Sequence, residues 1–289
     1  MPNETTLMRG VELAATINSD TASRAESLVA ATGVRPTLAT VLVGDDPASV
    51  TYVRMKRRRC EQLGLGTRHV GLPAETCTSE LVDTIAGLSH DAAVHGILLQ
   101  HPMGAHIDER AAFDAIAPDK DVDGVTSASF AAMALGQPGF ASCTPGGIIR
   151  LLDHYGVELA GRHAVVVGRS PILGKPMAAL LLGRDATVTV CHSRTRDLDA
   201  HLAGADLVVA AVGRPRLVHC GALKPGAVVV DAGYNPGNVG DVDFDSAARR
   251  ASFITPVPGG VGPMTIAVLL AQTVDAAQQQ LLVQSAISR

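Results

Sequence analysis

Short apolar runs rich in β-branched residues recur along the chain and alternate with longer stretches whose apolar residues have helical spacing. Each short run predicts a buried strand of a parallel sheet, and each longer stretch predicts a helix that covers it. This alternation is typical of α/β folds. The predicted strands are residues 37–43, 67–72, 96–100, 164–167, 187–191, 206–213, 227–233 and 252–255, and the predicted helices are 11–31, 48–63, 79–88, 128–135, 146–155, a helix from near 176 to 182, and 265–282.

A glycine turn follows the strand predicted at 164–167. Gly168 ends that strand, Gly174 follows six residues later, and a helix then begins near Pro176. The free N–H groups and partial positive charge of a helix N-terminus bind phosphate, and glycines let the backbone approach it. Because Arg169 and Ser170 occupy the turn, its spacing departs from G-x-G-x-x-G. On the turn alone, a tight corner without a ligand is an equal alternative.

The next predicted strand, 187–191, ends where a dinucleotide-binding fold meets the adenosine ribose. NAD-binding folds usually place Asp or Glu there, whereas an arginine nearby accommodates the 2′-phosphate of NADP. Here Ser193 and Arg194 follow the strand without a carboxylate, and Arg169 lies in the glycine turn. The sequence therefore predicts NADP as the cofactor.

Glycine also ends two later predicted strands, at Gly213 and Gly233. Both positions can let a nucleotide lie against the backbone. Tyr234 opens the loop after the second of these strands. The loop 256–265 then contains three glycines and three prolines in ten residues, so we expect it to have a fixed shape.

The first part of the chain also contains polar residues that are candidates for a functional site. Tyr52 and Lys56 are four residues apart on the helix predicted at 48–63, so they share one face, although a pair at this spacing is more often solvated. Gln100 stands at the end of a predicted strand, where ligands collect in open α/β sheets. The loop 118–124 carries three carboxylates in five residues, and loop acids are ordinarily solvated.

The length, charge and composition of the chain limit the classes of protein to which it can belong. A chain of 289 residues suits two domains of moderate size, and a net charge of −4 with no long basic block argues against nucleic acid. No apolar stretch approaches the roughly 18 residues that span a membrane, and we expect a soluble cytoplasmic protein. The five cysteines are scattered and the ten histidines lack metal-site spacing, so we expect neither disulfides nor metal.

Six sequence blocks, in this order and spread over nearly the whole chain, closely resemble the bifunctional methylenetetrahydrofolate dehydrogenase/methenyltetrahydrofolate cyclohydrolase family. Because several separate blocks match, a functional role is favoured over simple solvation for Tyr52, Lys56 and the acids of the loop 118–124. The blocks are Y-V-R-M-K at 52–56, G-I-L-L-Q with Pro102 at 96–102, K-D-V-D-G at 120–124, C-T-P-G-G at 143–147, G-R-S-P-I-L-G-K-P-M at 168–177 and P-V-P-G-G-V-G-P-M-T at 256–265.

The resemblance implies two α/β domains with a cleft between them. The first, residues 1–140 completed by the C-terminal helix 265–289, would bind folate and carry the catalytic residues, and 141–264 would be a Rossmann-type NADP-binding domain. It also implies a homodimer in one-carbon metabolism, which supplies purine biosynthesis. The implied reactions are oxidation of 5,10-methylenetetrahydrofolate by NADP and hydrolysis of the methenyl product to 10-formyltetrahydrofolate.

Residue roles come from the same resemblance. Lys56 would act at the reactive carbon with a lowered pKa, Gln100 would hold or tune it, Tyr52 would pack along the pterin and p-aminobenzoyl groups, and Asp123 would accept hydrogen bonds from the pterin. The backbone at Pro258, Gly259 and Gly260 would close over the folate. The cofactor contacts implied here or predicted above are Gly168, Arg169, Ser170, Gly174, Ser193, Arg194, Gly213 and Tyr234.

This chain departs from the family pattern at three places beside these residues. His101, Met103 and Gly104 replace the usual L-P-L-P continuation after Gln100, Val125–Ser127 replace F-H-P, and Tyr234 stands where Ile is commoner. Three alternatives remain at this point. They are a dehydrogenase without cyclohydrolase activity, a non-catalytic nucleotide-binding paralogue, and an NADP oxidoreductase acting on another small imine.

Overall fold

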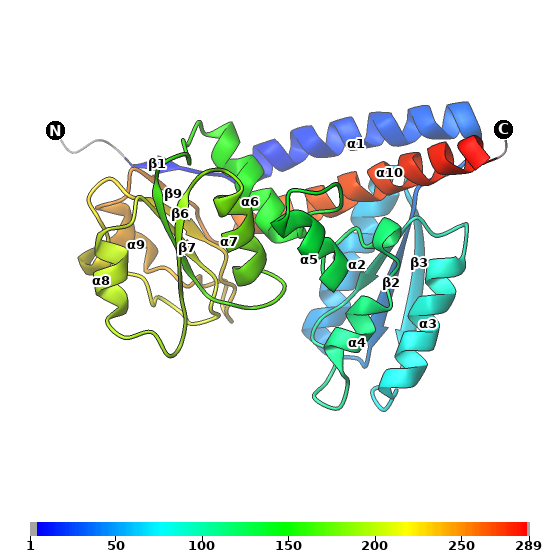
Figure 1. Cartoon of the computed structure of the whole chain (residues 1–289), viewed down its shortest axis with the longest axis horizontal. Helices are drawn as coiled ribbons and strands as arrows, with labels where there is room; N and C mark the ends of the chain where they lie inside the picture. Colours follow the sequence, from blue (N-terminus) through cyan, green and yellow to red (C-terminus); the bar gives the residue numbers. More distant parts are fainter. Residues whose placement is uncertain (1–4, 288–289) are drawn as a thin grey trace. The chain divides into compact units, whose positions relative to one another are not determined.

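The computed structural model describes residues 5–287 and divides them into two compact units. One unit comprises the chain up to Ala15, Met133–Gly136 and Ser142–Ile266. The other comprises Thr16–Ala132, Gln137–Ala141 and the chain from Ala267 onward. Two long helices, α1 (Gly10–Thr32) and α10 (Val261–Ile287), supply residues to both units (Figure 1).

The unit that begins at Thr16 contains a three-stranded parallel sheet in the order β3-β2-β4. The central strand β2 is almost wholly buried, as its apolar run requires, and every residue of β4 is buried. Helix α2 connects β2 to β3, and α3 connects β3 to β4. The bounds are β2 (Thr37–Val43), α2 (Pro47–Gln62), β3 (Gly66–Leu72), α3 (Thr78–His90), β4 (Gly96–Leu99), α4 (Glu109–Asp114), η1 (Pro118–Lys120) and α5 (Ser127–Ala134).

The other unit contains a six-stranded parallel sheet in the order β1-β9-β8-β7-β5-β6. Inward-facing side chains such as Val165, Val208 and Val229 form its core together with Leu202 and Ala247 from the covering helices. The bounds are β1 (Thr6–Leu7), α6 (Cys143–His154), β5 (His163–Val167), α7 (Gly174–Leu182), β6 (Thr187–Cys191), α8 (Leu198–Ala203), β7 (Leu207–Ala210), η2 (Cys220–Ala222), β8 (Val228–Asp231), α9 (Phe244–Ala248) and β9 (Phe253–Ile254).

The predicted fold class, two α/β units of which one is Rossmann-like, is confirmed. Helices α6 and α10 begin earlier than predicted, because their first turns contain Pro145 and Pro263 with neighbouring glycines, which resemble a loop in sequence. Proline is tolerated there because the first N–H groups of a helix have no helical partner. No strand is predicted at β1, since two residues carry no periodic pattern.

No helix within residues 5–287 combines the length and apolar character needed to cross a membrane.

Candidate functional site

Lys56 and Gln100 meet inside the unit of the three-stranded sheet. Lys56 is 6% exposed, and its Nζ donates to Gln100 Oε1 at 3.3 Å. The same Nζ lies 4.5 Å from the centroid of the Tyr52 ring, a cation–π distance. The predicted common helix face of Tyr52 and Lys56 is therefore confirmed as a geometric fact. Burial of an amine is costly unless it has partners, and here it has an amide oxygen and an aromatic face.

The sequence of α2 explains why this lysine points inward. Ser49, Val53, Lys56 and Cys60 follow helical spacing and form the buried face of the helix. Asp46 caps the helix by accepting a hydrogen bond from the Ser49 N–H at 2.8 Å. Burial raises the pKa of the Cys60 thiol to about 12, so the residue one turn beyond Lys56 stays protonated and neutral.

Gln100 has a fixed orientation at the end of β4. Its backbone N–H continues the sheet by donating to Val41 O at 2.9 Å, and its side-chain Nε2 donates to His101 O at 2.7 Å. With the amide nitrogen engaged there, the oxygen is the atom that faces Lys56. The His101 imidazole lies on the outer side of this loop, where Nδ1 is 2.9 Å from Glu109 Oε1.

Asp123 lies on a rigid turn of the same unit. The fully buried carboxylate of Asp121 accepts hydrogen bonds from Val125 N at 3.1 Å and Thr126 N at 2.8 Å. Next to Asp123 in the sequence, the Val122 carbonyl oxygen accepts a hydrogen bond from Gln272 Nε2 of α10 at 2.7 Å. The acids of this loop therefore have different environments, since Asp121 is enclosed and holds the turn while Asp123 is half-buried.

In the other unit, the glycine turn after β5 is closely packed. A Cβ on Gly168, whose φ is +136°, would lie 2.2 Å from Ala211 O, and a Cβ on Gly174 would lie 2.3 Å from Gly168 O. Ser170 Oγ accepts from the N–H groups of Leu173 at 3.2 Å and Gly174 at 3.3 Å, which ties the glycine turn to the start of α7. Both glycines are thus needed for the turn itself, and α7 begins slightly before the predicted Pro176.

The turn after β6 carries Ser193 and Arg194 in exposed positions. It is shaped by two local bonds, from His192 N to Thr195 Oγ1 at 2.9 Å and from Arg194 N to His192 Nδ1 at 3.2 Å. The hydroxyl and guanidinium are therefore held at the carboxyl end of a parallel strand, where nucleotides bind in such sheets.

Three further loops of this unit carry the remaining predicted residues. Gly213, with φ +65°, follows β7, and the 74%-exposed Tyr234 follows β8 with its hydroxyl donating to Asn238 Oδ1 at 3.0 Å. After β9, Gly259 has φ +99° and a Cβ on Gly260 would lie 2.6 Å from Pro256 O. Pro258 directly precedes Gly259 and is exposed.

Both parts of the chain match models of one family. Residues 8–123 match the catalytic domain of tetrahydrofolate dehydrogenase/cyclohydrolase, and residues 142–281 match its NAD(P)-binding domain. This chain belongs to the tetrahydrofolate dehydrogenase/cyclohydrolase family. The family resemblance given by the six sequence blocks is thereby confirmed.

Individual members of the family are similar over almost their whole length. The bifunctional protein FolD 1 of Streptomyces avermitilis is 69% identical over 278 residues, which are 96% of this chain and 97% of that protein. The crystal structure of the bifunctional enzyme FolD from Campylobacter jejuni has a TM-score of 0.93 at 42% identity and covers 96% of this chain and 99% of its own. The Trypanosoma brucei dehydrogenase-cyclohydrolase, complexed with NADP cofactor and inhibitor, has a TM-score of 0.93 at 36% identity, with 97% and 99% covered.

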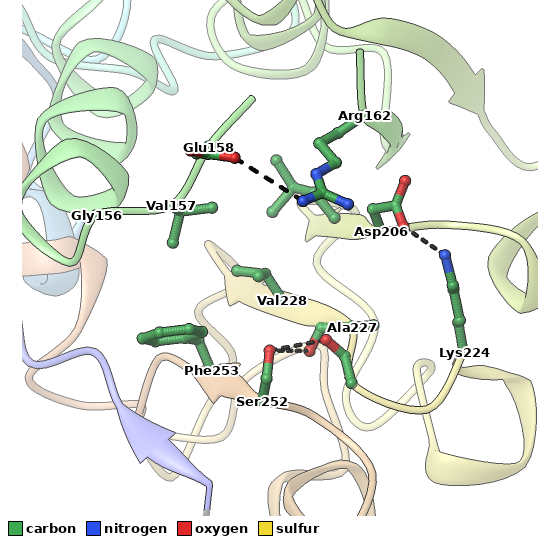
Figure 2. A pocket seen from close by; sticks show the side chains of 12 residues that line it. Gly156, Val157, Glu158, Arg162, Asp206, Lys224, Ala227, Val228, Ser252 and Phe253 are labelled. Atoms are coloured by element: carbon green, nitrogen blue, oxygen red, sulfur yellow. Dashed lines mark hydrogen bonds and ion pairs between the residues drawn. The ribbon is translucent and has the colours of Figure 1, made fainter. Parts of the chain in front are cut away.

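A cavity of about 330 Å³ in this family member (Figure 2) has none of the predicted cofactor residues in its lining. It opens at the amino ends of the strands, between Val157, Val228 and Phe253. Its charged groups pair with one another, Lys224 with Asp206 and Arg162 Nη2 with Glu158 Oε2 at 4.0 Å. Ligands of open α/β sheets bind at the opposite, carboxyl edge, so this cavity is not the dinucleotide site.

The structure thus places the predicted residues in two groups. Lys56 contacts both Tyr52 and Gln100, and Asp123 belongs to the same unit. The predicted cofactor residues and the loop Pro258–Gly260 all belong to the other unit, on loops that follow the carboxyl ends of its strands or, for Gly174, at the start of α7. Two buried carboxylates on that edge, Asp231 and Asp241, were not predicted. The sequence offers one signal for Asp231, because the apolar run before it predicts a strand and places this acid at the strand's carboxyl end.

Proposed function

We propose that this chain oxidises 5,10-methylenetetrahydrofolate to the 5,10-methenyl compound with NADP and then hydrolyses that compound to 10-formyltetrahydrofolate. The observation that carries the proposal is the buried Lys56 amine bound to Gln100 Oε1 and facing Tyr52, in a chain whose two parts match the catalytic and NAD(P)-binding models of one family.

The first reaction depends mainly on placement. Bound NADP would supply the hydride acceptor, and hydride transfer between two carbons requires close approach and alignment more than acid–base groups. Gly168, Arg169, Ser170 and Gly174 would hold the phosphates at the N-terminus of α7. Gly213 and Tyr234 would border the nicotinamide end.

The preference for NADP over NAD is supported by the turn after β6. The exposed Ser193 hydroxyl and Arg194 guanidinium stand there without a carboxylate before Asp197, and Arg169 is exposed in the neighbouring turn. A cation and a hydroxyl donor suit a 2′-phosphate, whereas a ribose 2′-hydroxyl is usually bound by an acid. These residues fit the group that the sequence predicts.

The second reaction needs proton transfer. A water must add to the methenyl carbon and lose a proton. The ring nitrogen must then gain a proton as its bond to that carbon breaks. Lys56 is the buried group that we assign to this task, and its contact with a neutral amide leaves proton release unopposed by Gln100. Gln100 is held by His101 O, so it would fix the Lys56 amine in one position.

Folate recognition would use the remaining residues of the predicted set. Tyr52, whose ring meets the Lys56 amine, would pack along the pterin and p-aminobenzoyl groups. Asp123 would accept hydrogen bonds from the amino and ring N–H groups of the pterin, an arrangement in which a carboxylate gives strong charge-assisted bonds. The turn bonds of Asp121 would keep Asp123 in place. Pro258, Gly259 and Gly260 would cover the folate with backbone groups.

We also propose that residues 1–140 with 265–289 form the folate-binding and catalytic domain and that 141–264 form the NADP domain, although β1 and the start of α1 pack as part of the unit of the six-stranded sheet. The chain would act as a homodimer in the cytoplasm, within the one-carbon metabolism that supplies purine biosynthesis. Sedimentation analysis of the purified protein tests the oligomeric state, and a single species at the mass of one chain would overturn the dimer.

The activity is tested by two initial rates on the purified protein. NADPH formation from 5,10-methylenetetrahydrofolate measures the dehydrogenase, and loss of absorbance of added methenyltetrahydrofolate measures the cyclohydrolase. We expect both. Dehydrogenase activity alone would indicate a monofunctional enzyme, and absence of both in a folded protein that binds NADP would indicate a non-catalytic paralogue.

A further inference from the structure

Two carboxylates lie buried together at the carboxyl edge of the six-stranded sheet. Asp231, the last residue of β8, is 3% exposed, and Asp241, ten residues later, is fully buried. Buried carboxylates are costly unless their oxygens accept hydrogen bonds. The bonds that these two accept come from loops that carry proposed cofactor contacts.

Asp241 connects the loops that follow β7 and β8. Its Oδ2 accepts from Val212 N at 2.6 Å and from Gly213 N at 2.9 Å, which are consecutive N–H groups of the loop after β7. Its Oδ1 accepts from Asn235 Nδ2 at 3.1 Å, in the loop after β8. Gly213 therefore owes its position to the side chain of a residue far along the chain.

Asp231 fixes Asp241 and the base of the same loop. Its Oδ1 accepts from Gly233 N at 2.9 Å and from Asp241 N at 3.0 Å, while Oδ2 accepts from Val242 N at 2.9 Å. Its own N–H donates to Thr255 Oγ1 at 2.7 Å, at the end of β9. The two acids thus join the loops after three neighbouring strands.

Two glycines make room for the carboxylates. A Cβ on Gly233 would lie 2.2 Å from Asp241 Cγ, and a Cβ on Gly240 would lie 1.8 Å from Asp231 Oδ2. Close approach of the two carboxylates therefore explains why both positions are glycine. Gly233 directly precedes the exposed Tyr234. The contact between Gly233 and Asp241 therefore also fixes the backbone position from which the Tyr234 side chain extends.

We propose that Asp231 and Asp241 are positioning residues for the cofactor, which hold the loops around Gly213 and Tyr234 in the arrangement that binds the dinucleotide. The proposal rests on the proposed function for the identity of the cofactor. It assigns to Asp241 an effect on NADP binding that acts through Val212 and Gly213, with no contact between its own carboxylate and the cofactor.

The proposal separates the two activities. Replacing Asp241 with Asn puts an amide N–H₂ or a weaker neutral acceptor against the donors of Val212, Gly213 and Asn235. Losing charged-acceptor hydrogen bonds of roughly 1.5–3 kcal/mol corresponds to about 10- to 100-fold in affinity. We expect this loss in NADP binding and in KM for NADP. The cyclohydrolase needs no hydride acceptor, so its rate should stay within about twofold of the wild-type rate.

The experiment compares full-length wild type, Asp241→Asn and a matched control, Asp206→Asn. Asp206 also accepts a backbone N–H, from His163 at 3.0 Å, but it lies at the amino edge of the sheet. NADP affinity is measured by titration calorimetry, the cyclohydrolase by methenyl absorbance, and folding by thermal melt. We expect weaker NADP binding in Asp241→Asn only, with hydrolysis retained.

Unchanged NADP affinity in folded Asp241→Asn would overturn the proposal, as would an equal loss of NADP affinity and cyclohydrolase activity, which indicates a merely structural role. If Asp241→Asn does not fold, Asn235→Ala removes one donor to Asp241 and should weaken NADP binding by a smaller factor; no change in that variant would also overturn the proposal. Absence of catalysis in the wild type would refute the proposed function instead, and the calorimetric comparison would still decide the role of Asp241.

Discussion

The Nζ of Lys56 lies 3.3 Å from Oε1 of Gln100, and both side chains are buried. A carboxylate in place of this amide would stabilise the charged amine and oppose proton release, because an opposite charge within a few ångströms raises a lysine pKa. The amide holds the amine in position without that charge. The contact is therefore suited to a lysine that exchanges protons during a reaction.

Replacing Gln100 with Glu tests this relationship. The new carboxylate would pair with Lys56 and keep it protonated, so cyclohydrolase activity should fall about 10- to 100-fold at neutral pH, and its pH profile should shift upward. Initial hydrolysis rates across pH give the result. Gln137→Glu, an exposed change in the same unit, is the control. An unshifted profile in folded Gln100→Glu would count against the proton role of Lys56.

Cofactor preference is tested at Ser193. Ser193→Asp places a negative charge where the 2′-phosphate is expected, so kcat/KM for NADP should fall by one to two orders of magnitude while that for NAD stays equal or rises. Ser19→Asp adds the same charge on the exposed part of α1 and should leave the preference unchanged. Equal kcat/KM for NADP and NAD in the wild type would contradict the assignment of this turn.

Asp231 makes a contribution to stability that depends on pH. Burial raises the pKa of its carboxyl to about 6, although backbone N–H groups of Val242, Asp241 and Gly233 favour the charged form. In the unfolded chain the group titrates near 4, so between these values the folded state binds more protons and its stability decreases as pH rises. The difference amounts to about 3 kcal/mol at most.

Thermal melts of wild type and Asp231→Asn between pH 4 and 7 measure this effect, because the two proteins differ only at this carboxyl group, whose pKa is also raised by the neighbouring charge of Asp241. The melting temperature of the wild type relative to Asp231→Asn should increase as pH falls from 7 to 4. A constant difference, or one that changes in the opposite direction, would show that the carboxyl of Asp231 is not held in an unfavourable charged state.

Much of the fold was accessible from the sequence, because the continuous apolar runs at β2, β4, β5 and β8 require burial on both faces. Helical spacing likewise placed Tyr52 and Lys56 on one face. The environments of the acids were not accessible in this way. Asp121 and Asp241 occur in polar, loop-like stretches, and only tertiary contacts with distant backbone N–H groups show that they are enclosed.

Glycines give a second example of what sequence leaves undecided. The sequence alone predicts phosphate binding at the turn of Gly168 and Gly174, yet both positions also have to be glycine because other backbone atoms lie only 2.2 and 2.3 Å from where their Cβ atoms would be. A pattern of glycines identifies such a turn without indicating which neighbour requires it. The contacts of Gly233 and Gly240 with two carboxylates are of the same kind.

The most direct measurement concerns the pair of activities in Lys56→Met, which keeps an apolar side chain of similar length and removes the amine. Positioned proton transfer is typically worth about 10² to 10⁴ in rate. We expect cyclohydrolase activity to fall by that order and dehydrogenase activity to fall much less, with Arg58→Met, an exposed change on the same helix, leaving both rates unchanged. Equal losses of both rates in a folded Lys56→Met protein would mean that Lys56 mainly binds folate, and full retention of hydrolysis would remove it from the mechanism.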